Sequence, residues 1–335
     1  MTPAMHVRRY HRHMTKLGPL VLLAVLAGCP GDDSISIDAL PDALQNAECD
    51  FEVRCELVPD QATCAAVLPL DNTNELTTIA EVNNGRINYD GKLAKQCVDT
   101  FETLGCNLSA IENAVVDSCS QMFSGTIAVG GACIVSEECV DQGNCEQTDP
   151  NCDATTACCV GACVAVQPKT AIGATCAGST CVEGAYCDIP TGTSSGTCKA
   201  LVQGEDAACD AFDACAAPRE CVIPQTMTAG TCKTLPAEGA QCDTQTFLGC
   251  NDLRDYCDKT TALCTHHVGV GDACNGPTGA TCVGFAMCDA MTSKCVARPS
   301  LGDACDESMG LDCIGDLSCV NLKCVGQPTG MTCAL

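Results

Sequence analysis

Cysteine is the residue that most constrains how this chain can fold. The chain has 335 residues and contains 35 cysteines, no tryptophan, four tyrosines and six phenylalanines. A chain so poor in large apolar side chains cannot build one large hydrophobic core, and a cysteine content this high is typical of a disulfide scaffold. We therefore expect cross-links to stabilise the fold by restricting the unfolded chain, in an oxidising compartment.

The amino terminus has the pattern of an export signal. A basic segment, Arg8–Lys16, precedes a short apolar run, Leu17–Ala27, and small residues follow. The run is shorter than the roughly 20 residues that span a bilayer. Cys29 directly follows Leu26-Ala27-Gly28, which resembles the lipobox of bacterial lipoproteins. The resemblance implies cleavage before Cys29 and acylation of its thiol and new amino terminus. The alternative is a secreted protein in which Cys29 forms a disulfide.

These features predict an exported chain attached by lipid to the bacterial cell envelope. Residues 1–28 are expected to be the lipoprotein signal peptide, and residues 29–36 a lipid-anchored tether. Pro30, which stands where an aspartate would favour the inner membrane, indicates the outer membrane or cell surface. No second long apolar run follows, so the expected membrane contact is the lipid on Cys29.

Residues 37–127 show helical periodicity. Apolar residues from Leu40 to Val58 recur at three- or four-residue steps, and a second series from Leu93 to Leu104 follows Asp90, a candidate N-cap. Ser109–Glu112 has the pattern of a capping box before a further helix. We expect three or four helices stapled by three disulfides, with a short strand or turn near residues 85–89. The six cysteines of this segment are Cys49, Cys55, Cys64, Cys97, Cys106 and Cys119.

Residues 128–335 form a degenerate cysteine repeat. A phrase of Gly-x-Cys or Gly-x-x-Cys recurs, with a looser version at Gly204–Cys209. Repeats that start at this phrase leave Cys333 without a partner. Repeats that start at the next cysteine give five even sets of four, after a leading set of eight. We therefore favour the second frame, in which the glycine phrase closes each repeat. Four cysteines allow three pairings, which the sequence does not separate.

In this frame the leading set consists of Cys133, Cys139, Cys145, Cys152, Cys158, Cys159, Cys163 and Cys176. The five sets of four are Cys181, Cys187, Cys198, Cys209; Cys215, Cys221, Cys232, Cys242; Cys250, Cys257, Cys264, Cys274; Cys282, Cys288, Cys295, Cys305; and Cys313, Cys319, Cys324, Cys333. With Cys29 acylated, all 34 remaining cysteines can pair.

The composition of the repeats favours turns and short hairpins over helices, because Gly, Thr, Asp and Pro are frequent. The expected fold class is small and disulfide-rich. It consists of tandem cysteine-knot-like repeats with short hairpins, preceded by a small disulfide-stapled α-helical domain. Each repeat is too small to bury much surface alone. We therefore expect an elongated string in which each repeat contacts mainly its neighbours.

Residues 133–163 carry a pattern that resembles a known family. The segment opens with three cysteines at six-residue steps from Cys133, and the adjacent pair Cys158 and Cys159 precedes Cys163. This resembles the Dickkopf N-terminal cysteine-rich domain. The whole chain is similar to bacterial cysteine-rich lipoproteins bearing such repeats. The resemblance implies a disulfide-rich architecture and no particular contact residue. Adjacent cysteines rarely bond to each other because the ring is strained, so we expect Cys158 and Cys159 to have different partners.

Other residue patterns give weak evidence for catalysis or metal binding. Zinc and iron–sulfur sites usually use Cys-x2-Cys steps, and the chain has none. Beyond the signal, its histidines are His266 and His267. The acidic groups Asp32-Asp33, Asp252–Asp258 and Asp303–Glu307 lack the EF-hand pattern. We therefore expect no catalytic site, no bound metal and no cofactor.

The charge of the chain narrows the class of partner. The formal net charge is −25 at pH 7, and loss of the basic signal makes it more negative. This charge disfavours nucleic acid. The expected function is that of a lipid-anchored, disulfide-rich cell-surface protein with a binding or structural role, toward an extracellular protein or polysaccharide. The alternatives are a hydrolase inhibitor that presents disulfide-constrained loops, and a metal-handling protein or enzyme.

Overall fold

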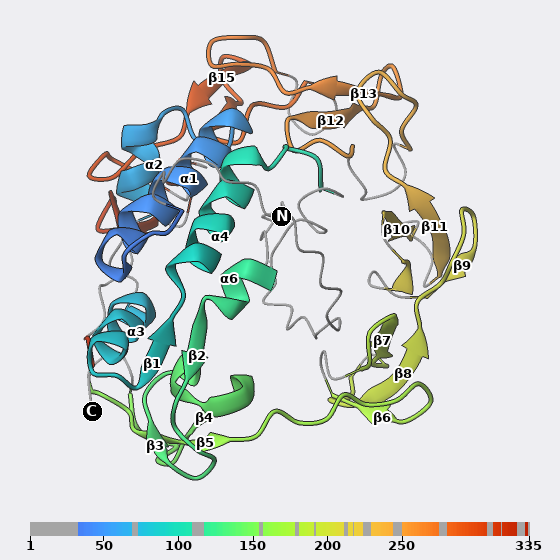
Figure 1. Cartoon of the computed structure of the whole chain (residues 1–335). Coiled ribbons are helices and arrows are strands. Elements are labelled where there is room, and N and C mark those ends of the chain that lie inside the picture. Colours follow the sequence, from blue (N-terminus) through green and yellow to red (C-terminus); the bar gives the residue numbers. More distant parts are fainter. Residues whose placement is uncertain are drawn as a thin grey trace, which may run out of the picture. The chain divides into compact units, whose positions relative to one another are not determined.

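The computed structural model describes most of the chain after residue 32 (Figure 1). The described residues are 33–68, 73–108, 117–153, 157–177, 181–190, 192–210, 214–216, 218–223, 229–243, 250–274, 280–306, 311–315, 317–326 and 332–333. The expected signal peptide, the lipidation residue Cys29 and the capping box at Ser109–Glu112 lie outside them. Contacts divide the chain into a smaller unit, Gln167–Ile223 with Met227–Lys233, and a larger unit, Pro30–Val166 with Thr234–Leu335.

The larger unit begins with a helical segment, as the periodicity predicts. Its described elements are η1 (Ile37–Ala39), α1 (Leu40–Arg54), α2 (Gln61–Val67), α3 (Thr73–Asn83), β1 (Ile87–Tyr89), α4 (Gly91–Thr103), α6 (Asp117–Gln121) and β2 (Phe123–Gly125). The described part therefore has five α-helices, where three or four were expected. The short strand expected near residue 87 is present, and it pairs antiparallel with β2.

Local capping and disulfides explain how the helices are held. The Asp90 carboxylate accepts the backbone N–H groups of Lys92 and Leu93 at 2.9 and 3.3 Å, so it caps α4 as expected. Asp60 caps α2 in the same way. Cys49–Cys64 joins α1 to α2, and Cys97–Cys119 joins α4 to α6. Cys55–Cys106 is the third bridge, so the prediction of three disulfides in this segment is confirmed.

The described end of the predicted tether is packed against the helical segment. The Ile35 N–H donates to the Gly91 carbonyl at 2.9 Å, and the Tyr89 hydroxyl donates to the Ile35 carbonyl at 2.9 Å. A Cβ on Gly91 would lie 2.4 Å from that same carbonyl oxygen. Ile35 therefore belongs to the folded body and is not part of a free tether.

Small antiparallel sheets follow, which confirms a disulfide-rich fold with short hairpins. The first repeat contains β3 (Ala132–Cys133), η2 (Ser136–Glu138), η3 (Val140–Gln142), β4 (Asn144–Gln147) and β5 (Gly161–Val164). The smaller unit contains β6 (Thr175–Cys176), β7 (Ala185–Asp188), β8 (Gly196–Ala200), β9 (Ala208–Cys209), β10 (Arg219–Val222) and β11 (Gly230–Thr234). Three two-stranded hairpins end the chain: β12 (Asp255–Asp258) with β13 (Leu263–His266), β14 (Ala286–Asp289) with β15 (Lys294–Ala297), and β16 (Ser318–Val320) with β17 (Lys323–Val325).

The disulfide pairing shows that the expected repeat frame is wrong. In five of the six repeats, the first cysteine bonds to the third and the second bonds to the fourth. The first repeat holds three additional cysteines, and there Cys139 bonds to the last cysteine, Cys163, which takes the place of the fourth. The pairs are Cys133–Cys145 and Cys139–Cys163, Cys176–Cys187 and Cys181–Cys198, Cys209–Cys221 and Cys215–Cys232, Cys242–Cys257 and Cys250–Cys264, Cys274–Cys288 and Cys282–Cys295, and Cys305–Cys319 and Cys313–Cys324. The glycine phrase therefore opens each repeat.

Two further bridges explain why counting favoured the wrong frame. Cys152 bonds to Cys159, and Cys158 bonds to Cys333 across 175 residues. The first repeat holds the extra cysteine that Cys333 needs, so Cys333 is not an orphan. The prediction that Cys158 and Cys159 have different partners is confirmed.

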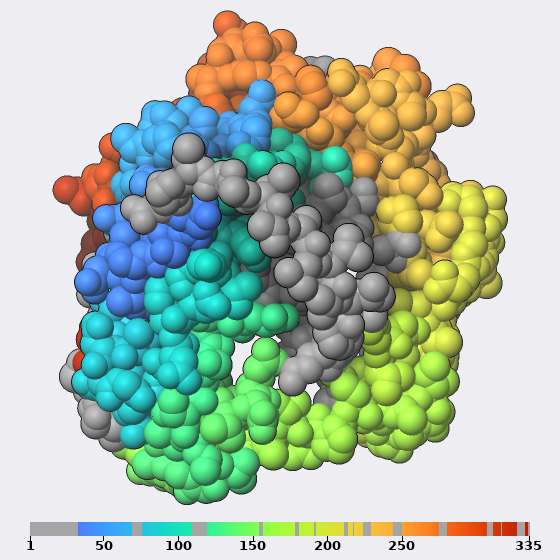
Figure 2. Space-filling view, viewed as in Figure 1, coloured from blue at the N-terminus to red at the C-terminus, as the bar shows by residue number. Residues whose placement is uncertain are grey.

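The last three repeats pack on the helical segment, contrary to the expectation that each repeat contacts mainly its neighbours. Ile314 and Leu317 share a buried cluster with Val58, Val67 and the Cys49–Cys64 bridge. In Figure 2 the blue surface of the helical segment meets the orange surface of the later repeats. Backbone hydrogen bonds join the two parts: Gly284 N–H to the Glu56 carbonyl at 3.1 Å, and Leu253 N–H to the Cys106 carbonyl at 2.8 Å. The last repeats and the helical segment thus share a buried cluster.

Polar contacts join the two repeats of the smaller unit. The Tyr186 hydroxyl donates to Asp210 at 2.7 Å, and the Lys199 ammonium contacts Asp188 and Asp210 at 2.8 and 2.7 Å. Burial and the Asp210 carboxylate raise the pKa of Tyr186 to about 12. The hydrogen bond from Lys199 lowers the pKa of Asp210. Among the described helices of the whole chain, none is long and apolar enough to cross a membrane.

Candidate binding surface

In five of the six repeats the glycine phrase forms a tight turn at the start of the repeat. In the third repeat Asp206, with a φ of +63°, stands at the place of the turn glycine. In the fifth repeat the Asp272 N–H donates to the Gly269 carbonyl at 3.2 Å, and Gly271 has a φ of +94°. This left-handed conformation at the third turn position is typical of a type II turn and favours glycine. The same turn hydrogen bond is present at residues 128–131, 171–174, 237–240 and 300–303.

The residue before the turn glycine is exposed at the tip of the turn. In four repeats it is aliphatic, namely Val129, Ile172, Val270 and Leu301, and its exposed fraction lies between 49% and 61%. The other two repeats have Glu205 and Glu238 at this position. The sequence contains a signal for these positions, because an aliphatic residue precedes the turn glycine in four repeats.

The turns are tied to the disulfide framework. In five repeats the turn glycine donates its N–H to the carbonyl of the fourth cysteine, as Gly271 does to Cys295 at 2.8 Å. In the third repeat Asp206 makes this hydrogen bond, to Cys232 at 2.9 Å. The fourth cysteine returns a hydrogen bond from its own N–H, as Cys295 does to Asp272 at 2.9 Å. A turn fixed in this way cannot fold over to bury its apolar tip. It would also lose little conformational entropy on binding.

The disulfide cysteines gather in groups that resemble metal clusters in distance alone. The sulfur atoms of Cys133, Cys139 and Cys163 lie within 4.8 Å of one another, and four other repeats have equivalent groups. All 34 cysteines of the described residues are disulfide-bonded. A metal is bound by the thiolate form of cysteine. The sulfur atoms of these groups lie close together because they form neighbouring disulfides, and a disulfide sulfur is not a thiolate.

The two histidines occupy different surroundings. His266 Nδ1 contacts the fully buried carboxylate of Asp255, its partner across the β12–β13 hairpin. This hydrogen bond raises the pKa of His266. The His267 ring lies 5.4 Å from the Tyr256 ring, with Nδ1 2.7 Å from the Thr281 hydroxyl, and burial lowers its pKa. The histidines are thus part of the folded hairpin, where a surface loop was expected.

The acidic groups considered as calcium ligands have separate partners. Asp252 forms a two-point ion pair with Arg254, at 2.9 and 2.8 Å. Asp258 accepts the backbone N–H groups of its own hairpin loop, and Asp303 accepts the N–H of Ser300 at 2.9 Å. These carboxylates therefore stabilise turns and do not converge on one point. Asp32 and Glu307 lie outside the described residues.

An ion cluster that the sequence did not indicate joins the first repeat to the helical segment. The Arg86 guanidinium lies 3.0 Å from Glu81 of α3 and 2.9 Å from Glu138 of η2, and both carboxylates are fully buried. Glu138 also accepts the N–H groups of Ile134 and Val135. Glu81 and Glu138 are too far apart in sequence for any local pattern to reveal the cluster.

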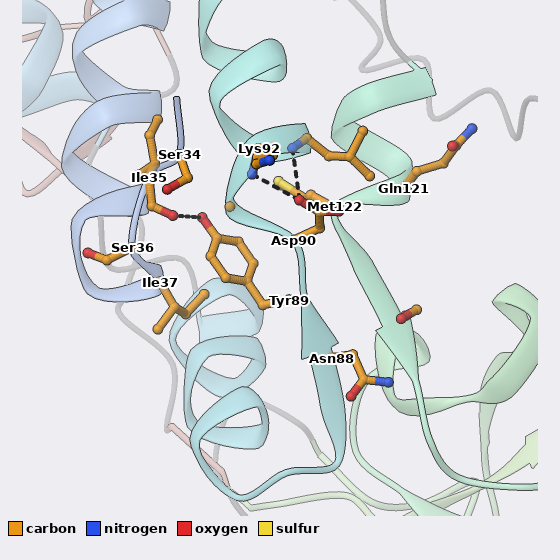
Figure 3. Close-up of a pocket in the computed structure, with 13 residues that line it drawn as sticks. Ser34, Ile35, Ser36, Ile37, Asn88, Tyr89, Asp90, Lys92, Gln121 and Met122 are labelled. Atoms are coloured by element: carbon orange, nitrogen blue, oxygen red, sulfur yellow. Dashed lines mark hydrogen bonds between the residues drawn. The ribbon is translucent and has the colours of Figure 1, made fainter. Parts of the chain in front are cut away.

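An open cleft lies between η1, β1 and the start of α4. Its volume is 770 Å³, and its lining includes Ile35, Tyr89, Leu93 and Met122. Figure 3 shows Tyr89 pointing toward Ile35 and Asp90 turned toward the start of α4. Tyr89 and Asp90 thus already form hydrogen bonds with backbone groups of the protein.

No protein-family model matches this chain, and neither the curated proteins nor the solved structures contain a match.

Proposed function

We propose that this chain is a lipid-anchored protein of the bacterial cell surface that binds another protein through the turn tips of its repeats. The turn tips are Val129, Ile172, Val270 and Leu301. The observation that carries the proposal is their exposure on turns fixed by disulfides. An exposed aliphatic side chain on a turn that is already fixed by hydrogen bonds loses little conformational entropy on binding another protein.

The tyrosines favour a protein partner over a polysaccharide. Sugar rings usually stack on exposed aromatic rings, and the chain has no tryptophan. Its described tyrosines are engaged in the fold: Tyr89 bonds to Ile35, Tyr186 is buried against Asp210, and Tyr256 packs on His267. The acidic charge of the chain favours a partner whose contact surface has a neutral or basic rim.

The experiment is chemical cross-linking of the natively exported protein on intact cells. The test variant carries Val129→Ser, Ile172→Ser, Val270→Ser and Leu301→Ser, and the control carries Met291→Ser. Met291 is 97% exposed but lies on the β14–β15 hairpin and not on a turn tip. We expect the four-site variant to lose a cross-linked protein that the wild type and the control both retain. Equal cross-linking in all three would refute binding through the turn tips.

A hydrolase inhibitor is the second candidate, and one observation favours it. Met291 projects from a loop held by Asp289, which accepts the Met291 N–H at 2.8 Å and the Thr292 hydroxyl at 2.9 Å. A fixed, exposed side chain is what a protease pocket can receive. Inhibition of an extracellular protease that is lost in Met291→Asp would support this function, while binding lost only in the turn-tip variant would favour the first proposal.

Four further properties of the proposed protein stay predictions. The proposal includes acylation of Cys29, placement in the outer membrane, Dickkopf-like repeats that act as knot-like modules, and no catalytic activity. The high disulfide content supports an exported or surface location. The acidic charge supports the absence of a nucleic-acid partner.

A further inference from the structure

The Cys158–Cys333 bridge contains the one exposed cysteine among the described disulfides. Cys158 is exposed, whereas every other described cysteine is buried or half-buried. The neighbouring cysteine, Cys159, is buried in its bridge to Cys152. Because exchange needs direct access of a thiolate to a sulfur atom, exposure separates Cys158 from the other bridged cysteines.

The two ends of this bridge differ in their surroundings. Cys333 is buried, and its N–H donates to the buried Thr77 hydroxyl of α3 at 3.1 Å. An external thiol can therefore approach the bridge from the Cys158 side and not from the Cys333 side. The asymmetry determines which sulfur is attacked and which one leaves.

The bridge also has the largest sequence separation, 175 residues, whereas the bridges within repeats have separations of 7 to 24 residues. It is independent of the bridges that hold the last repeat, Cys305–Cys319 and Cys313–Cys324. That repeat also keeps its apolar contacts with the helical segment through Ile314. Opening the bridge therefore removes one covalent link without dismantling a repeat.

We propose that Cys158–Cys333 is a thiol-exchange site for small-molecule thiols. The thiolate of the incoming molecule attacks Sγ of Cys158 in line with the disulfide. A new sulfur–sulfur bond forms to Cys158, the bond to Cys333 breaks, and its electron pair leaves on the Cys333 sulfur, which takes up a proton from water. One disulfide replaces another, so the step needs no separate oxidant or reductant.

The experiment is titration of the full-length exported protein with reduced glutathione, followed by trapping with N-ethylmaleimide and peptide mapping. We expect glutathione on Cys158 and maleimide on Cys333, about tenfold sooner than any other cysteine is modified, because access limits exchange. Modification of another bridge first, glutathione on Cys333, or simultaneous opening of many bridges would overturn the proposal.

Two variants test whether the early reaction occurs at this bridge or at any disulfide of the chain. Cys158→Ser with Cys333→Ser removes the bridge, and the early adduct should disappear. Cys305→Ser with Cys319→Ser removes a bridge within a repeat, and the early adduct on Cys158 should persist. Persistence of an early adduct in the first variant would contradict the assignment, and the wild-type map decides the matter even if a variant does not fold.

Discussion

Arg86 links the first repeat to the helical segment through an ion cluster. Its guanidinium faces two fully buried carboxylates, Glu81 and Glu138. A buried ion pair adds little net stability when intact, but removal of one partner leaves buried charge without compensation. The cluster therefore makes the folded state sensitive to this one arginine.

We predict that Arg86→Met lowers the free energy of unfolding by about 3 kcal/mol, because both carboxylates stay buried. The matched control is Lys95→Met, which removes an exposed pair with Asp99 one helical turn away and should leave the free energy of unfolding nearly unchanged. Guanidinium unfolding with intact disulfides measures both. Equally small losses of unfolding free energy in the two variants would mean that Arg86 does not contact the two buried carboxylates in solution.

His266 and His267 are adjacent, yet their pKa values shift in opposite directions. The pKa of His266 is raised, so its contribution to stability is present below about pH 6.5 and is lost as the pH rises through its folded-state pKa. The pKa of His267 is lowered, so it destabilises the folded state as the pH falls below about 6.5.

We predict opposite pH slopes for His266→Gln and His267→Gln, each compared with the double variant. His267→Gln keeps His266, so its stability should fall as the pH rises from about 6 to 8. His266→Gln keeps His267, so its stability should rise over the same range. Unfolding midpoints measured across this range check the signs, and parallel slopes would show that the two environments are not distinct.

At the scale of the element, a glycine two residues before the fourth cysteine lets hairpin strands approach closely. A Cβ at Gly196 would lie 1.9 Å from the Asp188 carbonyl oxygen, and one at Gly230 would lie 1.9 Å from the Val222 carbonyl oxygen. Gly161 of the first repeat is similarly crowded, by the Glu146 carbonyl at 2.5 Å. Three repeats thus use the same residue for the same steric reason.

We predict that Gly230→Ala destabilises the smaller unit by about 1–3 kcal/mol, because its contacts are backbone atoms that cannot move aside. Gly326→Ala is the control, since a Cβ there meets no atom within 4 Å. Amide hydrogen exchange of β10 and β11 reports the local effect. Unchanged protection in Gly230→Ala would contradict the strand spacing.

Local sequence patterns predicted individual helices and strands correctly. They did not predict the contacts that join distant segments of the chain. The N-cap at Asp90 and the strand near Ile87 were visible because each depends on adjacent residues. The repeat frame was not, because it depends on hydrogen bonds such as Gly271 to Cys295 and on the distant bridge of Cys158. Among the residues of the candidate surface, the aliphatic turn tips could have been recognised from the glycine phrases, whereas their exposure could not.

At the scale of the whole molecule, the described larger unit is held together by the packing of the last repeats on α1 and α2. Ile314 is buried in that shared core. We predict that Ile314→Ala costs about 2–5 kcal/mol and raises hydrogen exchange in β16, β17 and α2 together. Val320→Ala, an exposed position on β16, should change stability by at most about 0.5 kcal/mol. Faster exchange confined to the last repeat would contradict a shared core.

In the proposed anchored protein every cysteine is modified, Cys29 by lipid and the others by disulfide formation. Intact mass of the protein exported by a bacterial host, measured with and without reduction and alkylation, tests it most directly. The account predicts an acyl mass on Cys29, no thiol accessible before reduction, and 34 thiols after it. Many free thiols, bound metal, or an unmodified Cys29 in a disulfide would contradict it.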